Sequence, residues 1–125
     1  MNAPIKPSPL TVLIIEDEAM IALMLEDSMS VLGHRVCAIA STLDEARRHV
    51  ASGGFDLAIV DCHLKGEDAW PAVDMLARAN IPFILSSGGS LADMPSAYAQ
   101  RPLLSKPYSM AAIGEALAAC ETVRS

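Results

Sequence analysis

The sequence predicts a three-layer α/β fold, in which helices cover both faces of a five-stranded, doubly wound parallel sheet with strand order 2-1-3-4-5. The clearest strand, Leu57–Asp61, is an uninterrupted apolar run that ends in a carboxylate, which is typical of a strand buried on both faces. Strand-like and helix-like segments alternate five times along 125 residues, which favours right-handed βαβ units within one domain. Because 52% of the residues are apolar and 19% are charged, the chain can build a packed core.

The expected strands are short apolar or β-branched runs. In chain order they are Thr11–Ile15, Arg35–Ala40, Leu57–Asp61, Pro82–Leu85 and Leu103–Leu104. The first helix is expected over Ala19–Leu32, because its apolar residues recur at helical spacing and Gly33 follows as a stop signal. Thr42 and Glu45 have the spacing of a capping box and predict the start of the second helix.

The three remaining helices have signals of different strength. Trp70 is expected to anchor the third helix in the core. The fourth helix, at roughly Leu91–Ala99, is weak because Pro95 interrupts it. Ser109 is a candidate N-cap for the last helix.

Composition and charge argue against several classes of function. A net charge of −6 argues against a nucleic-acid partner, since phosphate contacts need clustered Lys and Arg. No apolar run reaches membrane-spanning length and the N-terminus has no signal-peptide pattern, so we expect a cytoplasmic protein without a membrane partner. Cys37, Cys62 and Cys120 lack metal-binding spacing and are expected to be reduced and mostly buried. Residues 1–9 are expected to form a flexible tail and residues 10–125 a single domain with no output domain attached.

Chemically active side chains stand at the carboxyl ends of four of the five expected strands. The second strand lacks one, and it is an edge strand in the flavodoxin-like order. Because the carboxyl ends of parallel strands meet at one edge of the sheet, where such sheets bind ligands, we expect these side chains to converge. In chain order they are Glu16, Asp17, Asp61, Ser86, Ser87 and Lys106.

The charges of this set indicate phosphoryl chemistry. Three carboxylates brought together repel one another, and a divalent cation would relieve that repulsion. With oxygen ligands only, and no His or Cys set, the cation is Mg²⁺ or Mn²⁺. A phosphoryl group could then be held between the cation and Lys106, with the Ser87 hydroxyl as a hydrogen-bond donor. Ser87 is preferred to Ser86 because side chains alternate along a strand and only one of the two can face the crevice. Asp61, at the centre, is placed to attack phosphorus in line and become an aspartyl phosphate.

This ordered set resembles the receiver domain of two-component response regulators. The resemblance extends from Thr11 to about Glu121. Each motif alone is weak, but the set in order at the right strand ends is specific. The matching residues are Glu16-Asp17, Asp61, Ser87-Gly88 and Lys106-Pro107.

The resemblance implies a role for each site residue. Asp61 would be the phosphoacceptor and a Mg²⁺ ligand. Asp17 would bind Mg²⁺ directly, Glu16 through water, and His63 through its backbone carbonyl. The lysine of Lys106-Pro107 would pair with a phosphoryl oxygen, and the peptide bond between these two residues is usually cis in this family.

Residues 61–67 and 82–88 also resemble a subgroup of stand-alone receivers that is associated with alphaproteobacterial stress signalling. In that subgroup the fourth strand reads roughly Pro-Phe-x-x-Ala-Thr-Gly-Tyr. Here Gly89 stands in place of its Tyr, and Leu103 stands where most receivers carry an aromatic switch residue. An alternative hypothesis is therefore that phosphorylation orders the Gly88–Ala99 segment.

Other classes of function fit the sequence less well. An Asp-nucleophile phosphatase of the haloacid dehalogenase type would need an acid at position 63, which is His63. A flavin or nucleotide binder would need a Gly- or Thr-rich anion loop where Glu16-Asp17-Glu18 stands. A docking domain that works without phosphorylation would not need the intact acid and lysine set.

The resemblance also implies protein partners. A sensor histidine kinase or a histidine phosphotransferase would dock near the first helix and the loop after Lys106, and a downstream protein would bind in response to phosphorylation. The chain is expected to be a monomer or weak dimer, and to catalyse only its own phosphotransfer and dephosphorylation.

Overall fold

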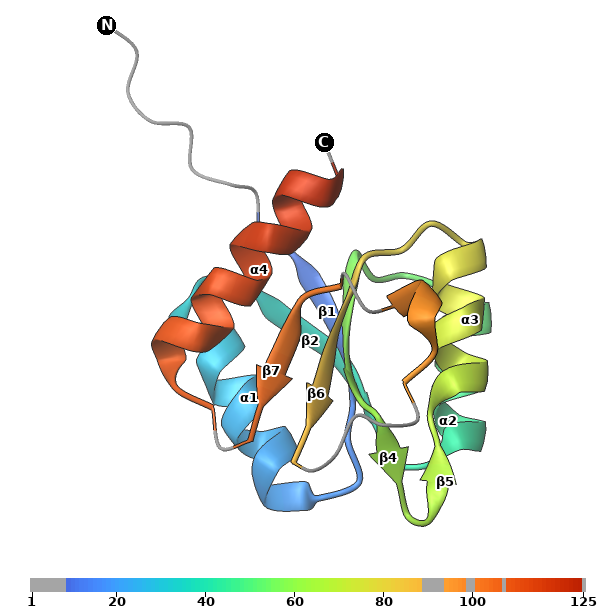
Figure 1. Cartoon of the computed structure of the whole chain (residues 1–125). Helices are drawn as coiled ribbons and strands as arrows, with labels where there is room; N and C mark the ends of the chain where they lie inside the picture. The colour runs from blue at the N-terminus through green and yellow to red at the C-terminus, as the bar shows by residue number, and fades with distance from the viewer. Residues whose placement is uncertain (1–8, 89–93, 99–100, 107, 125) are drawn as a thin grey trace, which may run out of the picture.

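The computed structural model describes residues 9–88, 94–98, 101–106 and 108–124, which alternate strands and helices around one five-stranded sheet (Figure 1). The strands of this sheet are β1 (Thr11–Ile15), β2 (Arg35–Ala40), β3 (Leu57–Asp61), β6 (Phe83–Ser87) and β7 (Leu103–Ser105). The α-helices are α1 (Ala19–Val31), α2 (Leu43–Ser52), α3 (Trp70–Arg78) and α4 (Met110–Arg124). Every pairing in the sheet is parallel and the order is β2-β1-β3-β6-β7, which confirms the predicted order 2-1-3-4-5.

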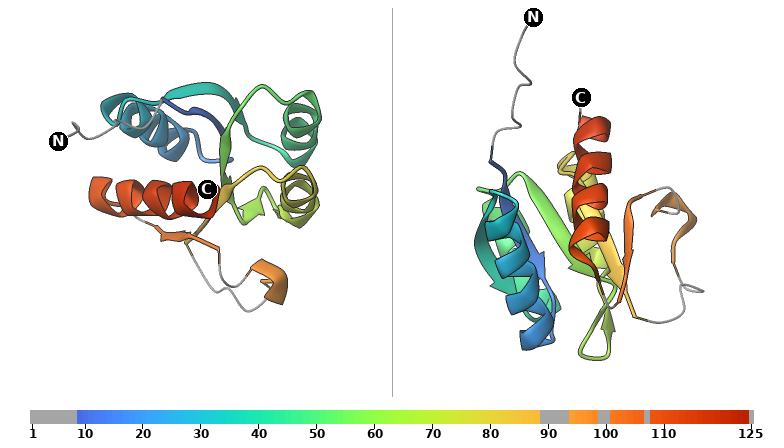
Figure 2. Two further views of the ribbon diagram at one scale, coloured as in Figure 1. Left: turned by 90° about the horizontal axis from the view of Figure 1, so that it is seen from above. Right: turned by 90° about the vertical axis from the view of Figure 1, so that its left-hand side faces the viewer.

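Successive residues of a strand enter two different cores, one on each face of the sheet. On β1, Val12 and Ile14 pack in the core under α1 and α4, whereas Leu13 and Ile15 pack in the core under α2 and α3. Figure 2 shows α1 and α4 on one side of the sheet and α2 and α3 on the other. All four β1 side chains have no exposed surface, so this strand is covered on both faces, as its uninterrupted apolar run predicts.

Polar caps begin α2 and α4 where the sequence predicts them. The Thr42 hydroxyl accepts a hydrogen bond from the Glu45 N–H (3.1 Å), as in a capping box. The Glu45 carboxylate reaches back to Ser41, whose hydroxyl donates to it at 2.8 Å. The Ser109 hydroxyl accepts from the Ala112 N–H (3.0 Å) at the start of α4.

The segment after β3, for which the sequence predicts no strand, forms an antiparallel hairpin of β4 (His63–Leu64) and β5 (Glu67–Asp68). Its two-residue turn places Lys65 at φ 46° and Gly66 at φ 82°. Positive φ values at both central residues match the twist of a tight hairpin, and glycine adopts them at low cost.

The expected weak helix at about Leu91–Ala99 lies partly outside the described residues. In the described part, the chain forms the 3₁₀-helix η1 (Ser96–Tyr98) directly after Pro95. Proline has a restricted φ and no N–H to donate, and it commonly stands just before the first turn of a short helix.

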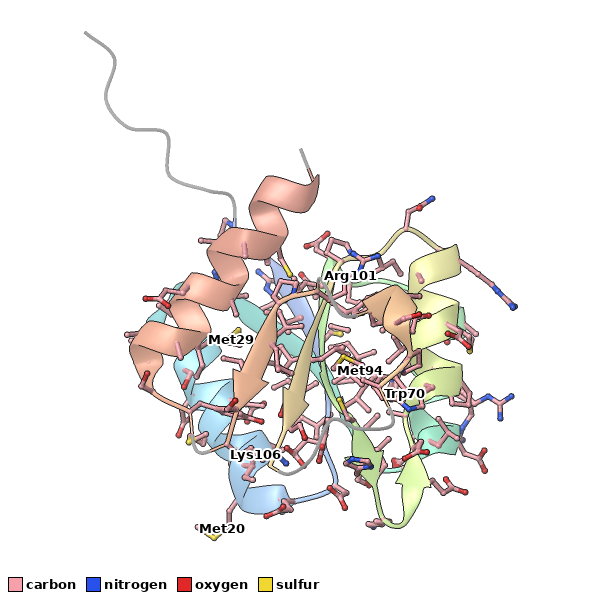
Figure 3. The ribbon with its side chains drawn as sticks, in the orientation of Figure 1. Met20, Met29, Trp70, Met94, Arg101 and Lys106 are labelled. Carbon is pink, nitrogen blue, oxygen red and sulfur yellow. The ribbon has the colours of Figure 1, made fainter. Side chains whose placement is uncertain are left out.

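Tyr98 attaches η1 to α3. Its ring stacks on Trp70 with centroids 6.1 Å apart and meets Phe83 edge-on at 5.6 Å. Its hydroxyl donates a hydrogen bond to Asp74. Trp70 is thus partly buried against the core, as expected, and Figure 3 shows it next to Met94 on the side of the sheet that carries α3.

Among the described residues, we find no helix whose length and apolar content would let it span a bilayer. The three cysteines are free thiols; Cys62 and Cys120 are buried and Cys37 is exposed, in line with the prediction.

Candidate functional site

Three carboxylates converge at the C-terminal edge of the sheet. Glu16 and Asp17 follow β1, and Asp61 is the last residue of the neighbouring strand β3. Ile15 and Val60 are partners in the parallel register, so the residues that follow them leave the sheet side by side. One carboxylate oxygen of each acid lies within 4.8 Å of those of the other two. Glu16 and Asp61 are only 2% and 5% exposed.

Lys106 brings a positive charge to this acidic cluster from β7. Its Nζ lies 3.0 Å from Asp61 Oδ2 and 3.0 Å from Glu16 Oε1. Figure 3 shows it at the edge where β6 and β7 end. Burial alone would lower the pKa of Lys106, but its bonds to Glu16 and Asp61 outweigh burial and raise it, so the lysine stays charged. The side chain passes close to Gly88, where an added Cβ would lie 3.4 Å from the lysine Cδ.

One lysine does not neutralise three carboxylates. Burial and the neighbouring Asp61 raise the pKa of Glu16 to about 8, so repulsion within the cluster is relieved by a proton at neutral pH. Burial acts to raise the pKa of Asp17 as well, but its hydrogen bonds, the largest of them from the Lys65 N–H, together outweigh burial and lower the pKa. Asp17 therefore remains ionised beside a protonated Glu16.

The donor set fits a hard divalent cation. All three side chains offer oxygen atoms, the cluster carries excess negative charge, and Asp17 is ionised and partly exposed to solvent. Mg²⁺ prefers such oxygen ligands and retains part of its water shell. Glu16, Asp17 and Asp61 are thus the residues that would hold it.

The β4–β5 hairpin braces two of these acids. The Lys65 N–H donates to Asp17 Oδ2 (3.0 Å) and the His63 N–H donates to Asp61 Oδ1 (3.2 Å). The His63 ring pairs with Asp68 at 3.1 Å on the exposed side of the hairpin. The sequence reasoning missed this hairpin; the Lys65-Gly66 pair, a two-residue turn ending in glycine, is the signal that could have shown it.

The two serines at the end of β6 have different surroundings. Ser86 is paired in register with Asp61, and its hydroxyl is hydrogen-bonded to the phenol of Tyr108. Ser87 is buried, and its carbonyl accepts a hydrogen bond from the Lys106 N–H (3.1 Å). By this register Ser86 lies on the same face of the sheet as Asp61, and the role of Ser87 as the hydroxyl donor to a phosphoryl group stays a prediction. The sequence reasoning overlooked Tyr108; the predicted cis bond at Pro107 lies outside the described residues.

The sheet order and this acidic edge define a receiver-type α/β domain. Neither a protein-family model nor a curated protein matches the chain. Among solved structures, it is similar to the solution structure of SdrG from Sphingomonas melonis Fr1, with 38% identity, 93% of this chain and 99% of that chain covered, and a TM-score of 0.84. It is also similar to the BeF3-activated conformation of SdrG from Pseudomonas melonis Fr1, with 40% identity, coverage of 90% and 98%, and a TM-score of 0.76.

A third similar structure is the receiver domain of the response regulator PhyR from Erythrobacter litoralis, with 28% identity, 91% of each chain covered and a TM-score of 0.79. The chain therefore belongs to the receiver domains of response regulators. It is a signalling module by family.

Proposed function

We propose that this receiver domain is the phospho-accepting module of a two-component phosphorelay. In this proposal Asp61 takes a phosphoryl group from a phosphohistidine donor in the presence of Mg²⁺, and phosphorylation changes partner binding. The observation that carries the proposal is the position of the Asp61 carboxylate. It is buried, 3.0 Å from Lys106 Nζ, and clustered with the acids that follow β1.

The chain's own groups suit each part of this transfer. An Asp61 carboxylate oxygen would attack phosphorus, the O–P bond would form as the donor's P–N bond breaks, and the electron pair would stay on the imidazole nitrogen, which takes a proton from solvent. Lys106 would pair with a phosphoryl oxygen as charge shifts, and Ser87 would donate a hydrogen bond to another. Bound Mg²⁺ would supply charge neutralisation between the carboxylates and the phosphoryl group. Its ligands would be Glu16, Asp17, Asp61 and the His63 carbonyl.

An apolar face on α1 supports docking of a protein phosphodonor. Met20 and Leu23 are 83% and 55% exposed, which is unusual for large apolar side chains that lie next to each other. They belong to an open groove of about 470 Å³ that is lined by residues of α1 and by Met110 at the start of α4. The residues lining it are Met20, Leu23, Met24, Asp27, Ser28, Val31 and Met110. We propose that a histidine kinase or histidine phosphotransferase docks there.

The test is incubation with acetyl phosphate, with and without Mg²⁺, followed by intact-protein mass spectrometry. We expect one phosphate per chain, only with Mg²⁺. Asp61→Asn should abolish uptake, whereas Asp44→Asn, which alters an exposed aspartate on α2, should leave it intact.

The alternatives predict other results. Continuous release of phosphate in excess over protein would indicate a hydrolase. A wild-type protein that takes up no phosphate would contradict the proposal and favour a docking domain that works without phosphorylation.

A further inference from the structure

A pair of hydroxyls, one buried and one partly buried, lies beside the candidate site on the face of the sheet that carries α1 and α4. Ser86 is 1% exposed and its hydroxyl is hydrogen-bonded to the phenol of Tyr108. Around them on this face pack Ile84, Leu104 and Ile113. A buried hydroxyl that loses its hydrogen-bond partner is costly. Each hydroxyl therefore holds the other in place.

The pair completes a two-point attachment of the segment that carries Lys106. The first attachment is the backbone of Lys106 itself, whose N–H donates a hydrogen bond to the Ser87 carbonyl at 3.1 Å. Two residues later, Tyr108 bonds to Ser86, the preceding residue of β6. Lys106 and Tyr108 are thus attached to consecutive residues of one buried strand. The lysine side chain passes Gly88 to reach the two buried carboxylates.

The pair is also adjacent to the phosphoacceptor strand. Ser86 is paired in register with Asp61, and residues paired in a parallel sheet project from the same face. The phenol is close enough to the charged cluster for Lys106, Glu16 and Asp61 all to affect its ionisation. A displacement of Tyr108 would therefore move Lys106, two residues before it, and would leave the acids that follow or end β1 and β3 in place.

We infer that Ser86 and Tyr108 form a positioning pair that holds Lys106 in register with Asp61 for phosphoryl transfer. The inference rests on the proposed function of Asp61. The pair acts through Lys106 and does not itself take part in bond making. Removing one hydroxyl takes away its partner's hydrogen bond, so Tyr108, and Lys106 with it, shifts until the remaining hydroxyl finds water. Removing both leaves two apolar groups that can pack together.

The test is the rate constant of Mg²⁺-dependent phosphorylation by acetyl phosphate in Ser86→Ala, in Tyr108→Phe and in the double variant. Each single variant should be about tenfold slower, since a misplacement of ~1 Å can cost about a hundredfold. The double variant should be no slower than the slower single variant. Tyr98→Phe is the matched control, because it removes a phenol hydroxyl that bonds to Asp74 on the other face of the sheet.

The Mg²⁺ dependence of the rate is a second readout, which separates a displaced Lys106 from a general disruption of the site. The Mg²⁺ concentration for half-maximal rate should be unchanged in all variants, because the candidate ligands are on β1, β3 and the hairpin. Provided that the wild type takes up phosphate, three results would each overturn the inference. These are single variants that react at the wild-type rate, losses of rate that multiply in the double variant, and a rise in the Mg²⁺ requirement. Absence of phosphate uptake by the wild type would overturn the proposed function itself, and the inference with it.

Discussion

Lowering the pH from 8 to 6 should weaken Mg²⁺ binding about fiftyfold, because Glu16 takes up a proton that the metal ion must displace. Burial and the neighbouring Asp61 raise the pKa of Glu16 to about 8 in the metal-free protein. About half of the Glu16 side chains are then ionised at pH 8 and roughly 1% at pH 6, and a metal ion binds only the ionised form. The affinity for Mg²⁺ is therefore proportional to the fraction of Glu16 side chains that are ionised.

The same proton makes the stability of the metal-free protein depend on pH. The folded chain holds it up to about pH 8, whereas the unfolded chain releases it near the ordinary value of 4.5. Between these values the folded state binds more protons, so the free energy of unfolding falls as the pH rises, by about 1.4 kcal/mol per pH unit or about 3 kcal/mol from pH 5 to 7. Asp17 has a lowered pKa and acts in the opposite direction, but only near and below its ordinary value of 3.8. Saturating Mg²⁺ should remove the slope, because the bound ion takes the place of the proton.

Isothermal titration calorimetry with Mg²⁺ at pH 6, 7 and 8 checks the first effect, and urea unfolding without metal checks the second. Glu16→Gln should bind Mg²⁺ with little dependence on pH and lose the slope in stability. Glu115→Gln, which neutralises an exposed acid on α4, should behave as the wild type. Equal wild-type affinities at pH 6 and 8, or a slope that persists in Glu16→Gln, would show that this proton is not on Glu16.

Two further predictions separate chemistry from docking. Lys106→Met should slow phosphorylation by acetyl phosphate about 10²- to 10³-fold, the usual cost of losing one preorganised electrostatic group, and should bind Mg²⁺ at least as tightly as the wild type. Lys65→Met is the control. The side chain of Lys65 is exposed, and its contact with Asp17 is made by the backbone N–H, which the substitution keeps. Leu23→Glu on α1 should slow transfer from a histidine phosphotransferase at least about tenfold and leave the acetyl phosphate reaction unchanged. Leu103→Glu, which changes a 39% exposed leucine on β7, should leave both reactions intact; equal losses in the two leucine variants would count against docking at α1.

The main elements could be predicted because their signals are local. The run at β3 is apolar at four consecutive positions, and only a strand covered on both faces accommodates that pattern. Gly33 ends α1 with a φ of 87°, a conformation that marks helix ends in the sequence itself. Once parallel strands are identified, their carboxyl ends must meet, so Asp61 and Lys106 could be expected at one edge without any knowledge of side-chain packing.

The hairpin and η1 could not be predicted in the same way because they depend on tertiary contacts. Two-residue strands such as β4 and β5 are too short to show a periodic pattern, and the contact from the Lys65 N–H to Asp17 joins residues 48 positions apart. Tyr98 is one aromatic residue in a segment interrupted by proline. Only the folded chain shows its ring between Trp70 and Phe83.

Lys106 and Tyr108 show where strand-end reasoning stops. Lys106 comes directly after β7, so the end of the strand determines its position within one residue. Tyr108 is two residues further, beyond a proline and outside the strand, so the alternation of side chains along β7 does not determine the direction of its side chain. A rule that searches for an aromatic residue three positions before the lysine finds Leu103, which is 39% exposed. It cannot find Tyr108, which comes two positions after the lysine and bonds to Ser86 of β6. Residues that carry the chemistry follow from topology in this fold, whereas residues that position them follow from packing, which is why the Ser86–Tyr108 pair emerges only from the structure.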